Sequence, residues 1–225
     1  MGGFHGDIPT AELFIRSTQM AAFCPIMQYH AESKGEFNQD RTPWNIAERT
    51  GMPLVLDLYK KFADMRMNLL PYIYEQAVIS STEGIPMMQA MFAAFPEDPS
   101  CAELTEQYMF GDSMLVAPVT RESEVTKEIY FPNGKWISLF ENVEITGSCT
   151  RKSAAALPDI PVFIKGDRII PLNLSKTYKL GSYVGNQTDC YDQLTFMIYV
   201  TDLIQYRFSD DLWACSRDSR GKKAL

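Results

Sequence analysis

The side chains best suited to chemistry lie in the first fifty residues. His30 ends a short apolar run, and Glu32, Glu36, Asp40 and Glu48 follow it. A buried imidazole donates to and accepts from neighbouring hydroxyls, so His30 is a candidate ligand-binding residue, although an isolated histidine at this place is also typical of a satisfied core or loop residue. The four acids fall in one polar stretch, as solvated loop acids do, and we expect no catalytic pair among them.

Metal and cofactor chemistry have little support in the residues. His30-Ala31-Glu32 has the HxE spacing of zinc deaminases, but no Pro-Cys-x-x-Cys follows, and the chain holds only two histidines. Five cysteines are widely spaced without a Cys-x-x-Cys pair, as expected of buried thiols. No Gly-x-Ser-x-Gly, P-loop or dinucleotide fingerprint is present. We therefore expect neither a metal nor a cofactor.

The segments around His30 have the sequence pattern of alternating helices and strands. Thr10 is placed to cap a helix that runs to about Ala22. Residues 25–30 are short and apolar, as a buried parallel strand is, and a loop then extends to Pro53.

A long amphipathic helix follows that loop. Apolar residues recur every three to four positions over residues 54–81, Pro71 should kink this helix, and Gly84 should end it. The order of helix, strand and helix over residues 1–84 predicts the C-terminal part of a (β/α)8 TIM barrel.

The pattern changes after residue 85 to short runs of strand formers between turn residues. Strands are predicted at 114–119, 128–131, 135–139, 162–164 and 195–200, with a turn at Pro132-Asn133-Gly134. Residues 85–172 are therefore predicted to form an antiparallel β-sandwich, so the fold class is α/β followed by all-β. Residues 173–225 carry no motif that we can assign, although 193–208 could hold a late strand pair.

Composition limits the partners and the location. The formal charge of −7 comes from dispersed acids, which argues against a nucleic-acid footprint because that would need a clustered basic face. No apolar run approaches the roughly 20 residues that span a bilayer, so no membrane partner is expected. The chain opens without a secretory leader pattern, and a cytoplasmic location is the expectation.

Six motifs in order carry a resemblance to a known family. They are Gly2-Gly3-Phe4, His30, Arg41-Thr42-Pro43-Trp44, LLPYIY at 69–74, FGDSMLVAPV at 110–119 and IPVFIKG at 160–166. In these residues the chain resembles glycoside hydrolase family 31, from about residue 2 to about 172. The resemblance implies a catalytic barrel followed by a proximal C-terminal β-sandwich, and retaining cleavage of α-glycosidic bonds by two aspartates.

The resemblance also assigns roles to residues. Both family aspartates precede the Gly-Gly-Phe motif, so no catalytic residue is expected in this chain, and the missing N-terminal part of the barrel becomes an expected partner. His30 matches the histidine that hydrogen-bonds the sugar at the cleavage subsite, and Phe4 matches the aromatic residue that packs against it. Arg41, Trp44 and Arg66 are expected to brace the barrel. Asp112 is expected to be a structural carboxylate in its turn.

The sequence therefore predicts the C-terminal portion of an α-glucosidase-like or α-xylosidase-like hydrolase, inactive alone, that contributes to binding of a carbohydrate substrate. Two alternatives stay open. One is a non-catalytic carbohydrate-binding or interaction module, in which sugar binding would survive deletion of residues 1–84. The other is a truncated remnant without function, against which an upstream reading frame encoding the aspartates would argue.

Overall fold

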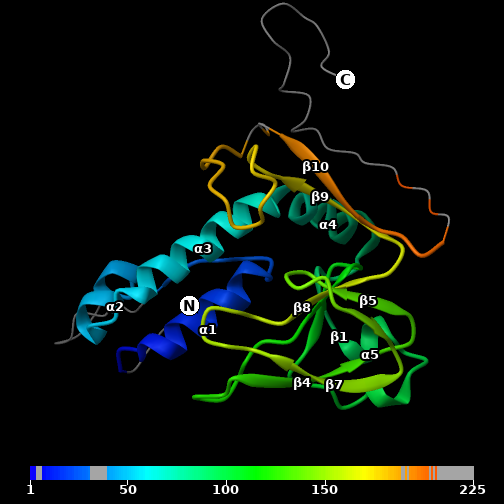
Figure 1. Ribbon diagram of the computed structural model, residues 1–225, viewed down its shortest axis with the longest axis horizontal. Helices are drawn as coiled ribbons and strands as arrows, with labels where there is room; N and C mark the ends of the chain where they lie inside the picture. The colour runs from blue at the N-terminus through cyan, green and yellow to red at the C-terminus, as the bar shows by residue number, and fades with distance from the viewer. Residues whose placement is uncertain are drawn as a thin grey trace, which may run out of the picture.

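The structure is a computed structural model that describes residues 1–3, 7–30, 40–188, 191, 193–202, 204 and 206. Helices α1 to α4 form one side of the molecule, and most of the strands form the other (Figure 1). A third group, the paired strands β9 and β10, lies over α4 (Figure 1).

Helix α1 (Ala11–Ala22) begins where the sequence predicts. Thr10 has an extended backbone, and its hydroxyl accepts a hydrogen bond from the Leu13 amide at 3.2 Å. This bond satisfies one of the free amides at the start of the helix. The inward face of α1 buries Phe14 and Ile15 almost completely. The predicted helix from Thr10 to Ala22 is confirmed.

The predicted loop from 31 to 53 contains a helix that the sequence analysis missed. Helix α2 (Pro43–Thr50) starts at a proline, which is tolerated at the first helical position, and ends at Gly51 with φ +65°. Ile46 is fully buried against α1 and α3, so packing rather than a long apolar repeat stabilises these two turns.

The long predicted helix is two helices in sequence, α3 (Leu54–Asn68) and α4 (Leu70–Glu83). The break is at Leu69, two residues before Pro71, because proline has no amide hydrogen to continue the backbone ladder. Gly84, with φ +72°, ends α4 as predicted. Both predicted ends and a disruption near Pro71 are therefore confirmed, but the disruption divides the helix in two where a kink in one helix was predicted.

The predicted strand over 25–30 is wrong, because this segment has no strand ladder in the described residues. Ile26 is 70% exposed and Tyr29 is 37% exposed, which is not the burial of a parallel strand. A strand needs a hydrogen-bonded neighbour along its length. The Met1 ammonium donates to the Gln28 carbonyl oxygen at 2.9 Å, and Arg66 donates to the Pro25 carbonyl oxygen at 2.6 Å. Neither bond belongs to a strand ladder.

The largest sheet has six antiparallel strands. In spatial order they are β1 (Met88–Ala90), β2 (Tyr108–Phe110), β3 (Met114–Val116), β8 (Val162–Lys165), β5 (Lys135–Ser138) and β6 (Glu144–Thr146). The short helix α5 (Met91–Ala94) and the 3-10 turn η1 (Pro99–Cys101) connect β1 to β2.

A second layer is the pair β4 (Thr126–Phe131) and β7 (Cys149–Ala154). The predicted turn at Pro132-Asn133-Gly134 carries the chain from β4 in this layer to β5 in the larger sheet. Between the layers the Phe131 and Phe163 rings meet edge to face with centroids 4.7 Å apart, and Trp136 is fully buried beside Phe131. The two layers share one apolar core, as in a β-sandwich.

The third group is the pair β9 (Arg168–Asn173) and β10 (Leu194–Tyr199). Ile170 and Leu172 of β9 pack with Phe62, Met65 and Tyr72 of α3 and α4, so this pair covers the helices. The same apolar cluster includes Phe110 and Ile164 of the six-stranded sheet. The predicted strand at 195–200 is confirmed as β10. Its partner is β9, and most of residues 203–208, where a later strand was suggested, lie outside the described part.

None of the helices in the described residues is long and apolar enough to cross a bilayer. This finding leaves the predicted cytoplasmic location untested.

Candidate functional site

His30 lies at the end of the exposed segment that follows α1, and its side chain is exposed. The neighbouring Tyr29 ring contacts Trp44 of α2 edge to face, with centroids 6.1 Å apart, and Tyr59 of α3 at 6.3 Å. His30 therefore stands beside an aromatic surface built by three separate segments. Sequence reasoning missed Tyr29 and Tyr59 as site residues. The signal that could have found Tyr29 is its position next to His30.

Residues 1–3 lie against the same segment. The bond from Met1 to Gln28 joins them directly, and Arg41 donates to the carbonyl oxygens of Gly2 and Asp7. Burial, and secondarily the nearby Arg41 guanidinium, lower the pKa of the Met1 ammonium. Gly2 has φ +69°, and a Cβ there would lie 2.8 Å from the Pro9 ring, so glycine is required. Phe4 lies outside the described residues.

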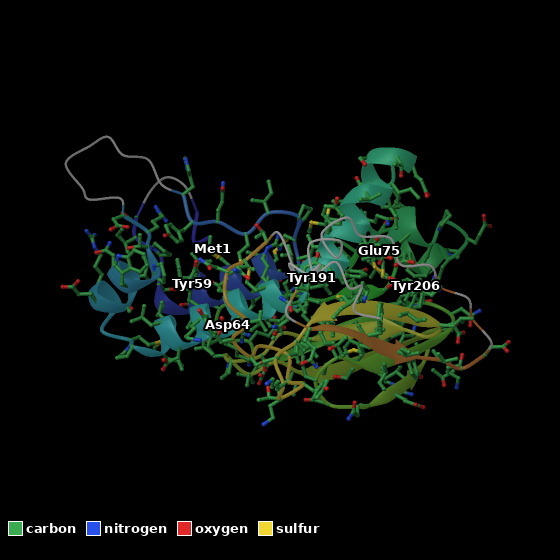
Figure 2. All side chains as sticks on the ribbon, turned by 90° about the horizontal axis from the view of Figure 1, so that it is seen from above. Met1, Tyr59, Asp64, Glu75, Tyr191 and Tyr206 are labelled. Carbon is green, nitrogen blue, oxygen red and sulfur yellow. The ribbon has the colours of Figure 1, made fainter. Side chains whose placement is uncertain are left out.

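Figure 2 places Met1 and Tyr59 toward the same end of the molecule, away from Glu75 and Tyr206. Both Met1 and Tyr59 pack against the apolar cluster between α1, α2 and α3. Met1, which precedes the Gly-Gly-Phe motif, and Tyr29, which precedes His30, thus lie at one surface of this helical layer.

Two arginines brace this surface, as predicted. Arg41 is 2% exposed and holds the start of the chain through the two carbonyl contacts above. Arg66 donates to the carbonyl oxygens of Cys24 and Pro25, which fixes the turn between α1 and the 25–30 segment. Burial lowers the pKa of the Arg66 guanidinium. Trp44 is different, because it is 57% exposed and extends the aromatic surface.

The acids of the predicted loop do not form a pair in the part that the structure describes. Asp40 accepts a 2.9 Å hydrogen bond from the Thr42 amide, which caps the turn into α2. Glu48 is exposed on α2. Glu32 and Glu36 lie outside the described residues. The described residues also contain no group of three or more His, Cys, Asp or Glu that could hold a metal ion.

The motif at 110–119 is structural. Gly111 has φ +62°, and a Cβ there would lie 2.1 Å from the Tyr72 hydroxyl. That hydroxyl donates to the Phe110 carbonyl oxygen at 2.7 Å, which joins α4 to β2. Asp112 accepts from the Ser113 hydroxyl and pairs with Arg168 at 3.3 Å. Asp112 is therefore a structural carboxylate as predicted, but its partners are side chains rather than turn amides.

Comparison with known protein families shows to which family the chain belongs. The profile described as the glycosyl hydrolases family 31 TIM-barrel domain matches residues 1–76, and that of the family's C-terminal domain matches residues 84–170. The chain belongs to glycosyl hydrolase family 31. This confirms the recognition from the six motifs.

Curated relatives in family 31 act on or transfer α-linked sugars by name. The chain is 44% identical over 214 residues to the isomaltosyltransferase of Sporosarcina globispora, which covers 94% of this chain and 20% of the relative. It is 37% identical over 175 residues to the 1,3-alpha-isomaltosidase of Kribbella flavida, covering 75% of this chain and 23% of the relative. The chain thus spans about a fifth of the length of these relatives.

Solved structures agree with the fold. The cycloalternan-forming enzyme of Listeria monocytogenes, in complex with a pentasaccharide substrate, matches with a TM-score of 0.91 at 44% identity, over 94% of this chain and 20% of that one. The cycloalternan-degrading enzyme of Trueperella pyogenes, in complex with isomaltose, matches at 0.69 and 37% identity, over 72% of this chain and 24% of that one. The predicted fold class, the C-terminal part of a barrel and then an antiparallel β-domain, is confirmed.

Proposed function

We propose that these residues are the C-terminal part of the barrel and the following β-domain of a retaining enzyme that acts on α-glycosidic bonds. His30 and Phe4 line the sugar site in this proposal, and the exposed aromatic surface of Tyr29 and Trp44 continues it. The nucleophile and the acid/base, two carboxyl groups about 5 Å apart in retaining enzymes, come from barrel residues beyond these 225.

One observation carries the proposal. The Met1 ammonium donates to the Gln28 carbonyl oxygen at 2.9 Å, so the residue that precedes Gly2 and Gly3 lies beside the segment that ends at His30. In a complete barrel, functional residues sit at the carboxyl ends of the strands. The match of residues 1–76 to the family's barrel domain supports such a place for His30, although residues 25–30 form no strand in the described structure. The names of the relatives, an isomaltosyltransferase and an isomaltosidase, support an α-glucosyl substrate.

The chemistry that this chain offers is binding and orientation. An imidazole at His30 is able to donate one hydrogen bond to a sugar hydroxyl and accept another. Aromatic rings pack against the apolar face of a pyranose ring. Such contacts hold the sugar in the correct position relative to the catalytic carboxylates. They raise the rate by fixing this position.

The division of the chain also belongs to the proposal. We place the last barrel units in residues 1–84, the proximal β-sandwich in 85–172, and a further β segment in 173–225. Gly84 ends α4 and supports the first boundary. The second boundary falls within β9, whose pairing with β10 ties the last segment to the preceding one.

A chimera tests the role of His30. In the S. globispora isomaltosyltransferase, the part that matches this chain is replaced by residues 1–225, and kcat/KM on an α-glucosyl substrate is measured with and without His30→Ala. We expect His30→Ala to lower kcat/KM by about 100-fold or more, since a lost polar contact to the reacting sugar costs several kcal/mol. Glu48→Ala, on exposed α2, is the matched control and should leave kcat/KM unchanged. Equal kcat/KM in both variants would remove His30 from the site.

A further inference from the structure

An open recess of about 630 Å³ lies in the β-domain, between the segment from α5 to η1 and the strands β4 and β7. Its lining includes Phe95, Asp98, Tyr130, Pro132, Asn133 and Ser148. Its volume falls within the roughly 300–1,000 Å³ that is usual for small-ligand sites. Figure 1 shows α5 and β7 at the other end of the molecule from α2, so the recess is separate from the surface around His30.

The walls of the recess are fixed by the fold. The Phe95 ring packs against fully buried Trp136, with centroids 6.2 Å apart, and the indole of Trp136 donates to the Pro132 carbonyl oxygen at 2.9 Å. A Cβ on Gly147 would lie 1.9 Å from that same oxygen, so the connection between β6 and β7 lies directly on the turn at 132–134. A rigid recess loses little conformational entropy when it binds a ligand.

Polar groups are spread along this rigid surface. The Asp98 carboxylate accepts from the Ser100 amide at 3.0 Å and from the Tyr130 hydroxyl at 2.8 Å. A carboxylate accepts about four hydrogen bonds, so acceptor capacity remains after these two. Asn133 and Ser148 are exposed at the rim and add an amide and a hydroxyl. The recess therefore offers donors and acceptors beside two aromatic rings.

The charge of the lining selects among ligand classes. Its charged members are Glu97 and Asp98, both acidic, and the Lys165 ammonium lies over the Phe95 ring at 5.1 Å from its centroid. The net charge of these three groups is negative, which disfavours phosphates, sulfates and carboxylates. The described residues contain no group of three or more acids, histidines or cysteines, which argues against a metal ion. Aromatic rings with an acid, an amide and a hydroxyl match a neutral sugar, which has an apolar ring face and a rim of hydroxyls.

We propose that this recess is a second carbohydrate-binding site, which takes a short neutral oligosaccharide at a distance from His30. Tyr130 packs against a sugar ring, Phe95 forms part of the wall behind it, and Asp98, Asn133 and Ser148 bind the hydroxyls. The preference for an α-linked ligand rests on the proposed function, whereas the preference for a neutral sugar rests on the lining of the recess. The site would hold one part of a long glucan while another part occupies the barrel.

The test is an NMR titration of the full chain with isomaltotriose, and separately with the β-linked cellotriose. We expect saturable shifts of the Tyr130, Asn133 and Ser148 amides with isomaltotriose. Tyr130→Ala should weaken binding about tenfold, as expected for the loss of one aromatic packing contact. Tyr183→Ala is the control, because Tyr183 is 70% exposed and lies outside the recess. Asn133→Ala, at an exposed position, should also weaken binding without threatening the fold.

Shifts confined to Gly2, Gly3 and Tyr29 would overturn the second site and leave the proposed function intact. Unchanged affinity in both Tyr130→Ala and Asn133→Ala would overturn it as well. Equal shifts in the recess with both sugars would uphold the site and remove only its α-linkage preference.

Discussion

Arg16 donates a 2.8 Å hydrogen bond to the carbonyl oxygen of Ala155, which lies 139 residues later in the chain. The same guanidinium also donates to the carbonyl oxygens of Glu124, Ala156 and Asp159. One side chain of α1 therefore satisfies four backbone acceptors in the loops before β4 and after β7. This contact joins the barrel part of the family 31 chain to its β-domain.

Replacing Arg16 should weaken that junction. Arg16→Ala leaves four carbonyl groups without their partner in a buried place, and we expect a loss of about 3 kcal/mol in the free energy of unfolding. Urea denaturation measures this loss. Arg49→Ala, at an exposed position on α2, should change stability by less than about 0.5 kcal/mol. A similar small effect for Arg16→Ala would show that the two parts do not depend on this residue.

Substitutions at Gly111 and Gly51 distinguish two reasons why a position requires glycine, a positive φ and a lack of space for a Cβ atom. Both have positive φ, of +62° and +65°, but only Gly111 has side-chain atoms in the place of a Cβ, whereas Gly51 has nothing within 4 Å. Gly51→Ala should cost about 1–2 kcal/mol for the backbone alone. Gly111→Ala should cost at least about 2 kcal/mol more, because Tyr72 and Gln76 must move. Equal losses in thermal or urea unfolding would contradict the close contact.

Asn68 ties the segment after β9 to the barrel helices. Its side-chain amide donates to the Asn173 and Ser182 carbonyl oxygens, at 2.9 and 3.1 Å, and its oxygen accepts from the Gly181 amide at 2.7 Å. In Asn68→Ala we expect hydrogen exchange at the Gly181 amide to accelerate about tenfold, because a hydrogen bond worth about 1.4 kcal/mol is lost. Asn45→Ala in α2 is the control. Unchanged protection of Gly181 would mean that other contacts hold this segment.

The ion pair between Lys127 and Glu106 predicts a pH dependence. Lys127 is nearly buried, and its hydrogen bond to the Glu106 carboxylate lowers the pKa of that acid below 4.5. A lowered folded pKa means that the contribution is complete above the unfolded value and is lost as the pH falls through the folded one. The urea concentration at the midpoint of unfolding should therefore decrease as the pH falls below about 4.5, and it should decrease less steeply in Glu106→Gln. Glu103→Gln, at an exposed position, should keep the slope of the unmodified chain.

Helices α1, α3 and α4 were predictable because their signals are local, whereas α2 was missed because packing rather than a long apolar repeat stabilises it. Thr10, Pro71 and Gly84 each act on the residues next to them, and the structure confirms all three. Strands β1, β2, β6, β7 and β9 escaped prediction. The first three have three residues each, too few for a visible alternation, β7 is mostly exposed, and β9 contains Pro171. Residues 25–30 were misassigned because a strand depends on a neighbour that its own sequence does not contain.

The candidate site divides in the same way. His30 and Arg41 could be singled out from the chain, since a motif marks each of them. The aromatic surface of Tyr29, Trp44 and Tyr59 could not, because three separate segments bring its rings together. The recess beside Tyr130 also combines separate segments. Asp98 bonds to Tyr130 of β4, and the pairing of β4 with β7 brings Ser148 to the same recess.

The central claim is that these residues bind and orient the sugar while barrel residues beyond them perform the chemistry. The most direct measurement is hydrolysis of 4-nitrophenyl α-glucoside and α-xyloside by the purified chain, beside the chimera with the S. globispora isomaltosyltransferase. We predict turnover by the chimera and none by the chain of 225 residues. Turnover by the chain alone would contradict the account, and would place the catalytic carboxylates among its own acids.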